Sequence, residues 1–124
     1  MNRNRMASDL FCQKRIFEQY RSDAKFRKLP FAVSFDHFIK YLSQPCYYCG
    51  EKETCTYTDP RNKERKLKYN GIDRMDNSKG YVYENLLPCC RVCNWMKKGM
   101  TLEDFLLHMY KIFRNRVTDW VAFK

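Results

Sequence analysis

Hydrophobic side chains recur at helical intervals in three stretches of the chain. The first, residues 8–27, predicts a helix for which Ser8 is a suitable N-cap and beyond which Pro30 prevents continuation. Its apolar positions are Leu10, Phe17, Tyr20 and Ala24. The rest of the stretch is polar and mostly basic, which predicts either a surface that contacts phosphates or a merely solvated helix face.

The second and third helical stretches are amphipathic. Ser34 is the expected N-cap of a helix over residues 35–42, and Thr101 opens a helix that runs to about residue 115 with a capping-box-like start. The apolar positions of the two helices are Phe35, Phe38, Ile39 and Leu42 in the earlier one, and Leu102, Phe105, Leu106, Met109, Ile112 and Phe113 in the later one. We expect both stripes to pack on the core.

Two other segments lack helical periodicity. Residues 51–68 are polar and highly charged and predict a long loop, with a short hairpin around Asp59–Pro60 as the alternative. The basic side chains of this loop are expected either to meet a phosphate backbone or to be solvated. Residues 117–124 form a short, rather apolar tail that we expect to dock through Trp120 and Phe123.

The charge of the chain bears directly on its partners. Lys and Arg number 24 against 14 Asp and Glu, which gives a formal net charge of +10. An excess of this size on a small domain favours a polyanionic partner, most simply nucleic acid. The alternative is a basic protein with a solvated surface and no such partner.

The cysteines indicate metal binding. The N-terminal residues contain no apolar run of the signal-peptide kind, and no segment approaches the roughly 18 apolar residues of a membrane span. We therefore expect an intracellular protein (host cytoplasm, nucleus or organelle), not secreted and with no membrane partner, in which thiols stay reduced. Seven cysteines in such a protein point to a metal before disulfides, and their odd number supports this.

Four of these cysteines form two pairs with metal-ligand spacing. Cys46 and Cys49 precede Gly50, and Cys90 and Cys93 open a short helical segment. Tetrahedral Zn²⁺ prefers soft ligands, and each Cys-x-x-Cys turn supplies two of them, so the four predict a closed structural zinc site. Cys89 competes with its neighbour for this role but lacks the two-residue spacing. Four ordinary buried cysteines are the alternative.

The stretch that contains these pairs resembles the HNH endonuclease family. The residues that carry the resemblance are Cys46-Tyr-Tyr-Cys-Gly, then Gly-Ile-Asp73-Arg-Met-Asp, then Asn85-Leu-Leu-Pro-Cys-Cys90-Arg-Val-Cys93-Asn94-Trp-Met-Lys-Lys-Gly. The resemblance implies an α+β chain with a ββα-metal core: a hairpin, one helix and a divalent cation between them. We expect a single domain over 1–124, with helical support in 1–44, the HNH-like core in 45–99, and a C-terminal helix and tail in 100–124.

The resemblance also implies roles for individual residues. Asp73 would end the first strand and give a carboxylate oxygen to a catalytic cation, and Asn94 would give its amide oxygen from the helix. Such hard ligands suit Mg²⁺ or Mn²⁺, distinct from the thiolate-bound zinc. Asn85 would tie the loop and orient the strand, although a turn-capping Asn is the alternative.

The chain departs from the family at Arg74, where a His usually acts as general base. A guanidinium stays protonated and cannot take that role, but it could clamp the phosphate while another group activates the nucleophile. The candidates for that other group are Tyr47, Tyr48, Tyr69, Tyr81, Tyr83, His37 and His108. The sequence does not choose among them.

Two functions follow from these observations. The first is a metal-dependent endonuclease that hydrolyses nucleic-acid phosphodiesters, with DNA expected before RNA. The second is an inactive HNH-derived zinc protein that binds nucleic acid or has a structural role, which the loss of the His favours. A zinc-finger transcription factor fits poorly, because the cysteine pairs are too far apart for a small finger. Recognition would rely on residues 1–30 and 51–68, on a homodimer, or on a larger assembly.

Overall fold

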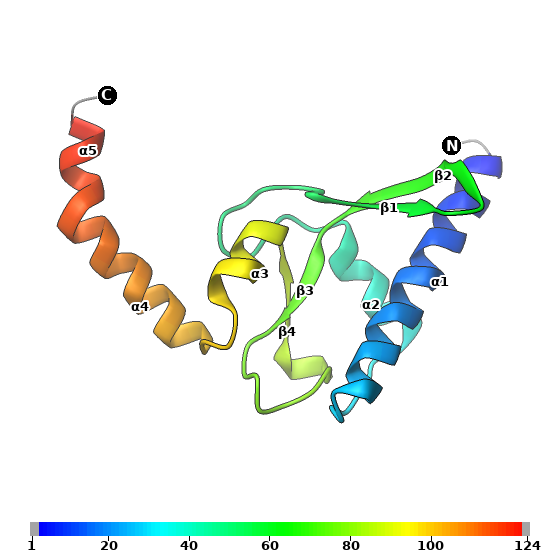
Figure 1. Ribbon diagram of the computed structural model, residues 1–124, viewed down its shortest axis with the longest axis horizontal. Coiled ribbons are helices and arrows are strands. Elements are labelled where there is room, and N and C mark those ends of the chain that lie inside the picture. The colour runs from blue at the N-terminus through cyan, green and yellow to red at the C-terminus, as the bar shows by residue number, and fades with distance from the viewer. Residues whose placement is uncertain (1–2, 123–124) are drawn as a thin grey trace.

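The computed structural model describes residues 3–122, in which helices and two small antiparallel sheets share one body and an extended arm (Figure 1). In chain order the elements are α1 (Arg3–Phe26), α2 (Phe35–Leu42), β1 (Cys55–Asp59), β2 (Asn62–Tyr69), β3 (Gly71–Arg74), β4 (Leu86–Cys89), α3 (Arg91–Lys97), α4 (Leu102–Ile112) and α5 (Thr118–Ala122). The predicted α+β class is confirmed. None of the described helices is long and apolar enough to cross a membrane.

Helix α1 begins earlier than its sequence predicted. Ser8 lies inside the helix, so its predicted role as the N-cap is wrong. No Gly or Pro interrupts the helix, and its first residues have adequate helix propensity, so nothing stops it from extending to Arg3. At the other end Lys28 takes a positive φ of 60°, and the Leu29 N–H reaches the Ala24 carbonyl at 2.8 Å, which is a normal way to end a helix.

One hydrophobic core joins α1, α2 and the β3–β4 sheet. Phe38 of α2 is fully buried at its centre, where Phe17 and Tyr20 of α1 meet its ring edge-on at centroid separations of 5.1 and 5.3 Å. Helix α2 begins at its predicted cap, since the Ser34 hydroxyl accepts a hydrogen bond from the His37 N–H at 3.2 Å. The buried members of the core are Ile16, Ala24, Val33, Phe38, Leu42, Ile72, Tyr81 and Leu86. The N-terminal helices thereby hold β3 in place.

The charged segment 51–68 is not mainly a loop, so that prediction is wrong. Strands β1 and β2 pair antiparallel across most of it, with Thr56 opposite Lys68 and Tyr57 opposite Leu67. In β2 the side chains alternate between exposed lysines and half-buried Leu67 and Tyr69, which pack against the core. The hairpin alternative was correct in kind but too short in extent.

The second sheet and α3 form the centre of the molecule. Strand β3 pairs antiparallel with β4, so that Ile72 lies opposite Pro88 and Asp73 opposite Leu87. A loop and a 3₁₀ turn connect the two strands, and α3 follows β4 directly. The result is a strand–strand–helix unit, and the β1–β2 hairpin reaches from it toward α1 (Figure 1).

The C-terminal arm, residues 102–122, extends away from the body (Figure 1). It consists of α4, a π-helical turn over Phe113–Val117, and α5. Of the predicted apolar stripe, Phe105 is buried, but Leu106, Ile112 and Phe113 are exposed, so the stripe is not a core-packing face throughout. Trp120 is 59% exposed, so it is not the buried anchor that was predicted, and Phe123 lies outside the described residues.

Candidate active site and metal centre

Four thiols converge where the loop after α2 meets the start of α3. The sulfur atoms of Cys46, Cys49, Cys90 and Cys93 all lie within 4.8 Å of one another. Zinc–thiolate bonds of about 2.3 Å in a tetrahedral centre place sulfur atoms about 3.8 Å apart, so a small inward movement suits these thiols to an ion. The four cysteines could therefore hold a metal, and all of them belong to the predicted pairs.

Short backbone bonds position these thiols. Gly50 has a φ of +82°, and its N–H donates to the Cys46 carbonyl at 3.0 Å, which closes the first turn. The Tyr47 N–H donates to the Pro88 carbonyl at 2.8 Å and fastens this turn to β4. Cys90 is the N-cap of α3, and its sulfur accepts a hydrogen bond from the Cys93 N–H at 3.2 Å.

Cys89 packs beside the four thiols but is not one of them. It is wholly buried, its thiol donates to the Cys90 carbonyl at 3.4 Å, and burial raises the pKa of Cys89, so it stays a neutral thiol. Cys46 behaves differently: burial acts to raise its pKa, but N–H donors from Cys49, Cys90 and Tyr48 outweigh this and lower the pKa to about 7. A thiol that readily ionises suits a metal ligand.

Asn70 supports the first cysteine turn, and sequence reasoning gave it no role. It is wholly buried, and its side-chain amide donates to the carbonyls of Gln44 and Glu51 at 2.9 Å each. Its Oδ1 accepts from the Thr54 N–H at 3.0 Å. An Asn before a Gly is typical of a turn, so the sequence did not indicate that Asn70 would form buried hydrogen bonds with the cysteine turn.

Asp73 lies in β3 with both carboxylate oxygens engaged. The Tyr48 hydroxyl donates to Oδ2 at 2.6 Å, and the Lys97 ammonium lies 3.3 Å from both Oδ1 and Oδ2. Lys97 is completely buried and also donates to the Arg74 carbonyl at 3.1 Å. Sequence reasoning missed Lys97; its place three residues after Asn94, one turn along α3, was the available signal.

Arg74 points into the loop that follows β3. Its Nη1 donates to the carbonyls of Asn77 and Lys79 at 2.8 Å each, and its guanidinium lies over the Tyr81 ring at 5.5 Å. The side chain is 6% exposed. Much of its hydrogen-bonding capacity is thus used to hold the loop, although the residue still lines the cavity described below.

Asn85 braces the same loop from its other end. Its Nδ2 donates to the carbonyls of Asp76 and Gly80 at 3.0 Å each, and its Oδ1 accepts from the Asp76 N–H at 2.9 Å. The side chain is buried and lies away from the cavity lining. These hydrogen bonds hold the two ends of the loop that follows β3 close together.

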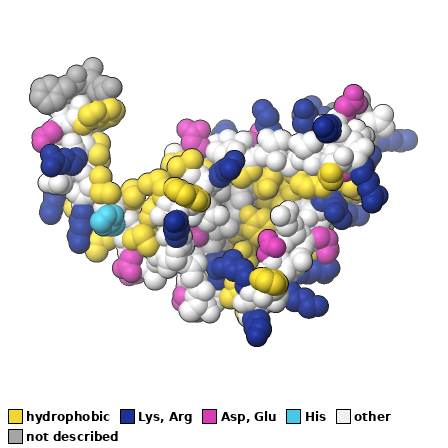
Figure 2. All heavy atoms as spheres, viewed as in Figure 1, with side chains coloured by type: hydrophobic (Ala, Val, Ile, Leu, Met, Phe, Trp, Pro, Cys, Tyr) yellow, Lys and Arg dark blue, Asp and Glu magenta, His cyan; other side chains and the backbone are white. Residues whose placement is uncertain are grey.

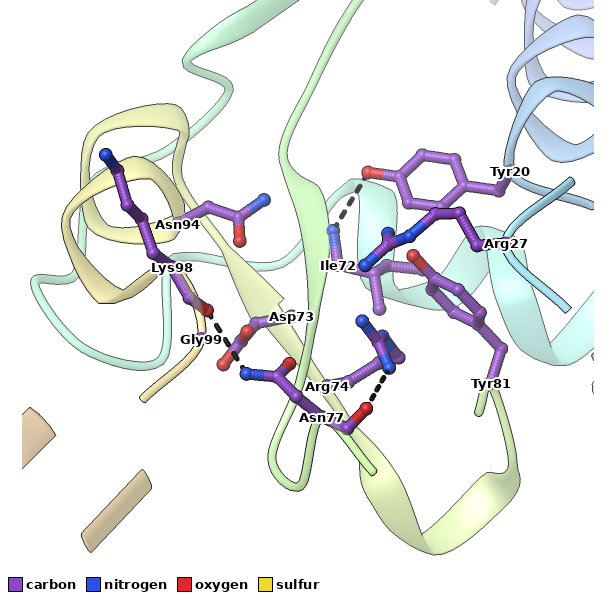
Figure 3. Close-up of a pocket in the computed structure, with 10 residues that line it drawn as sticks. All are labelled: Tyr20, Arg27, Ile72, Asp73, Arg74, Asn77, Tyr81, Asn94, Lys98 and Gly99. Carbon is purple, nitrogen blue, oxygen red and sulfur yellow. Dashed lines mark hydrogen bonds between the residues drawn. The ribbon is translucent and has the colours of Figure 1, made fainter. Parts of the chain in front are cut away.

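A cavity of about 350 Å³ opens between α1, β3 and α3 (Figure 3). Its lining residues are Tyr20, Arg27, Ile72, Asp73, Arg74, Asn77, Tyr81, Asn94, Lys98 and Gly99. Asp73 and Asn94 face the same space from the strand and the helix, as Figure 3 shows, while Arg27 and Tyr20 form the opposite wall. The structure therefore brings Asp73, Arg74 and Asn94 together at one opening.

The cavity is cationic. Arg27, Arg74 and Lys98 line it, against the single carboxylate of Asp73, whose charge is already paired with Lys97. An anionic group such as a phosphate suits this balance. Arg27 belongs to the basic N-terminal region, so its charge was evident in the sequence, but its place in the cavity depends on how α1 packs.

Tyr20 also lines the cavity, although its sequence position predicted only packing. Its hydroxyl oxygen accepts a hydrogen bond from the Ile72 N–H at 3.2 Å, and burial strongly raises its pKa. Gly71 makes room for this contact, because a Cβ there would lie 2.8 Å from the hydroxyl. Tyr20 therefore presents a protonated hydroxyl beside β3.

Of the predicted general-base candidates, Tyr81 alone lines the cavity. The Tyr48 hydroxyl is hydrogen-bonded to Asp73, and His37 of α2 lies against Tyr41 of the same helix and Tyr83 of the 3₁₀ turn. Burial raises the pKa of Tyr81, although nearby arginines oppose the shift. The remaining candidates, Tyr47, Tyr69, Tyr83 and His108, are not lining residues, and no histidine lines this cavity among residues 3–122.

Comparison with known proteins identifies the fold. No protein-family model matches the chain. The rare-cutting HNH restriction endonuclease PacI, for which a mechanism of DNA perturbation is described, superposes with a TM-score of 0.60 and 22% identity over 84% of this chain and 80% of its own. The strand pair and helix of this chain thus belong to an HNH fold, and the implied fold is confirmed.

Two viral proteins are similar in sequence. Uncharacterized protein R423 of Acanthamoeba polyphaga mimivirus is 32% identical over 83% of this chain, and the 29.0 kDa protein in the dda-modA intergenic region of Enterobacteria phage T4 is 30% identical over 84%. This chain spans 18% of the length of the first and 39% of the second. They connect the sequence to viruses without assigning it an activity.

Proposed function

We propose that this chain is a metal-dependent HNH-type endonuclease that hydrolyses phosphodiester bonds of nucleic acid, DNA in preference to RNA. One observation carries the proposal. Asp73 and Asn94, oxygen donors from the strand and the helix of the ββα unit, open into one cationic cavity. A protein that bound nucleic acid without cleaving it would not need both donors at that opening.

The donors suit a small divalent cation, Mg²⁺ or Mn²⁺. A carboxylate offers about four lone-pair sites, so Asp73 retains acceptor capacity beside its bonds to Tyr48 and Lys97. Asn94 is exposed and its amide points into the cavity (Figure 3). When bound, the cation would neutralise charge on the scissile phosphate and stabilise the leaving 3′ oxygen. The four thiols would hold a structural zinc at the other end of α3.

The phosphate would be held mainly by Arg27, and Lys98 would be a second donor if its ammonium turned from the Trp95 ring, over which it lies at 5.0 Å. Arg74 already donates to two loop carbonyls, so its contribution is largely the positive potential that it adds to the cavity. Tyr20 and Tyr81 are protonated at neutral pH, as tyrosines ordinarily are, and burial raises the pKa of each further, so they would donate hydrogen bonds. Neither hydroxyl is then a general base, and the proton of the attacking water would pass to bulk solvent.

The alternative is an inactive HNH-derived protein that binds nucleic acid. Two observations favour it. The buried Lys97 ammonium already pairs with the Asp73 carboxylate, and the described lining residues include no histidine that could act as a general base on water. The basic surface would then supply salt-dependent, largely sequence-independent affinity for the phosphate backbone.

Nicking of supercoiled plasmid with added Mg²⁺ or Mn²⁺ tests the proposal. Magnesium is withheld in one arm, and EDTA is used only with zinc content monitored, because a chelator also competes for the thiolate site. Asn94→Ala should reduce nicking by about a hundredfold or more while zinc content stays unchanged. Asn115→Ala, which alters another exposed asparagine, is the matched control and should nick normally.

Asp73→Asn should also abolish nicking, and it is preferable to Asp73→Ala because it leaves an acceptor for Tyr48 and Lys97. Equal nicking by wild type and Asn94→Ala would reject the assigned site. Absence of cleavage, with zinc retained and salt-sensitive binding of DNA or RNA, would favour the inactive scaffold.

A further inference from the structure

The C-terminal arm has two apolar sides that differ in what they contact. On the inner side Phe105 is buried and meets the Tyr48 ring edge-on at 5.1 Å, and Leu102 and Met109 are half-buried. This side fixes the arm to the body. The outer side is defined here as the outer face: Leu106, Leu107, Tyr110, Phe113 and Trp120, each between 45 and 59% exposed.

The outer face has the spacing of a helix-pairing seam. Leu106, Tyr110 and Phe113 recur at intervals of four and three along α4 and its C-cap, the pattern by which two α-helices pack against each other, and the π-helical turn changes the register before Trp120. Figure 2 shows hydrophobic side chains running along the arm. A continuous apolar surface of this kind on a basic protein marks a protein interface.

The first part of the arm is acidic and its middle is basic. Glu103 and Asp104 lie in the first turn of α4, Lys111 in its last turn, and Arg114 and Arg116 in the π-helical turn, while Asp119 follows in α5. Within the described residues, none of these six side chains forms an ion pair in the chain. Arg114 lies over the Tyr110 ring of the outer face at 5.7 Å. The basic turn therefore borders the outer face.

We propose that the outer face binds the outer face of a second copy of this chain, with the two arms antiparallel. Antiparallel pairing places the acidic start of one α4 beside the basic turn of the other, twice over, which makes the surface self-complementary under a twofold axis. Parallel pairing would instead juxtapose like charges. A nucleic acid is a poor occupant, because the face is apolar and one end is acidic. The inference does not depend on nuclease activity.

The π-helical turn fits such an interface. The Thr118 N–H donates to the Phe113 carbonyl, five residues back, so the turn changes the helical register within the outer face. Such turns occur frequently at functional sites. The π-helical turn therefore rotates the residues after it, including Trp120, about the axis of the arm relative to the residues of α4.

Sedimentation velocity of the zinc-loaded full chain over a wide concentration range tests the proposal. Wild type should change from monomer to dimer as concentration rises. Tyr110→Glu, in the middle of the outer face, should weaken dimerisation by about tenfold or more. Phe26→Glu is the matched control, because Phe26 is 89% exposed at the end of α1 and should have no effect. Circular dichroism and zinc content confirm that each variant is folded.

Charge reversal tests the antiparallel arrangement. Reversing the basic end (Arg114→Glu with Arg116→Glu) makes both ends negative, and reversing the acidic end (Glu103→Arg with Asp104→Arg) makes both positive. Each variant alone should lose most dimer, because antiparallel arms would then oppose like charges, whereas parallel arms oppose like charges already in the wild type and would show no such loss. An equimolar mixture should form a heterodimer, which shows that both variants remain competent to pair. Retention of the dimer by both variants alone would overturn the antiparallel arrangement.

A wild-type monomer at every concentration, or equal weakening by Tyr110→Glu and Phe26→Glu, would overturn the interface itself. A dimer that survives Tyr110→Glu would show that the chain associates through a different surface. Plasmid nicking is measured separately, so loss of nuclease activity alone leaves this interface intact and loss of the interface alone leaves the nuclease proposal standing.

Discussion

The two ends of helix α3 do different kinds of chemistry. Its N-terminal end, at Cys90 and Cys93, belongs to a cluster of four thiols whose atoms lie within 4.8 Å of one another. Its second half carries Asn94 to an open cationic cavity and Lys97 to the buried pair with Asp73, and the C-cap residue Lys98 also lines the cavity. One short helix therefore joins a closed site, suited to holding structure together, to an open site that can admit a ligand.

The open site gains its rigidity from the way α3 is attached at both ends. Helix α3 is seven residues long and would not be stable alone, so its orientation depends on the contacts at its two ends. Cys90 and Cys93 of the thiol cluster attach its start, and the buried Lys97–Asp73 ion pair attaches its end to β3. Asn94 stands between these two attachments, and disturbing either one should move it.

The largest expected effect comes from the sulfur end. Structural zinc in small domains contributes on the order of 10 kcal/mol, comparable to the whole stability of a typical domain. Cys93→Ser, or removal of zinc by a strong chelator, should therefore unfold the ββα unit and abolish any nicking. Zinc content and thermal unfolding followed by circular dichroism measure this.

Cys89→Ala is the matched control for that experiment. Cys89 is buried beside the cluster but keeps its thiol turned to a backbone carbonyl, so the variant should retain zinc and lose only a small packing contribution. If Cys89→Ala released zinc as fully as Cys93→Ser, the division of the cysteines described above would be wrong.

The same contrast explains which parts were predictable from sequence. The thiol cluster follows from two local motifs, because each Cys-x-x-Cys turn positions its own pair of thiols and two such pairs complete one tetrahedral metal site. Helix α2 was equally local, with Ser34 and a four-position stripe marking its bounds. The cavity gathers α1, β3, the loop and α3, and no local pattern says that Arg27 and Tyr20 face Asp73.

Two other elements were missed for different reasons. In β2, charged residues outnumber Leu67 and Tyr69, so net polarity suggested a loop although the alternation was present. In the arm, the apolar stripe was recognised, but periodicity alone cannot say whether a face meets the body or another molecule. Lys97 was missed because lysines are almost never fully buried unless paired, and its partner lies 24 residues away in sequence.

The next largest effect concerns the Lys97–Asp73 ion pair at the C-terminal end of α3. Removing one partner of a buried ion pair costs about 3–5 kcal/mol, because the remaining charge is left uncompensated. Lys97→Met and Asp73→Ala should each lose stability on that scale, and the double variant should lose clearly less than their sum. Urea unfolding of zinc-loaded protein gives all three free energies of unfolding.

The exposed pair Glu18–Arg21, at 2.6 Å, provides the reference. Arg21→Ala should cost less than about 1 kcal/mol because solvent screens both charges. Strict additivity of Lys97→Met and Asp73→Ala would mean that the pair does not couple β3 to α3, and the account of how Asn94 is held would need replacement.

The smallest effect concerns Arg27, and it distinguishes holding the fold from binding the ligand. Arg27 is exposed at the end of α1 and lines the cavity, so Arg27→Ala should change the free energy of unfolding by no more than about 0.5 kcal/mol. It should lower kcat/KM for nicking by about tenfold, the value of one hydrogen bond to a charged group. Arg27→Lys keeps the charge and should recover part of the loss, whereas Lys25→Ala, nearby on α1 but outside the lining, should change neither quantity. Wild-type kinetics in Arg27→Ala would assign the phosphate contact to Lys98 and leave α1 as a structural support.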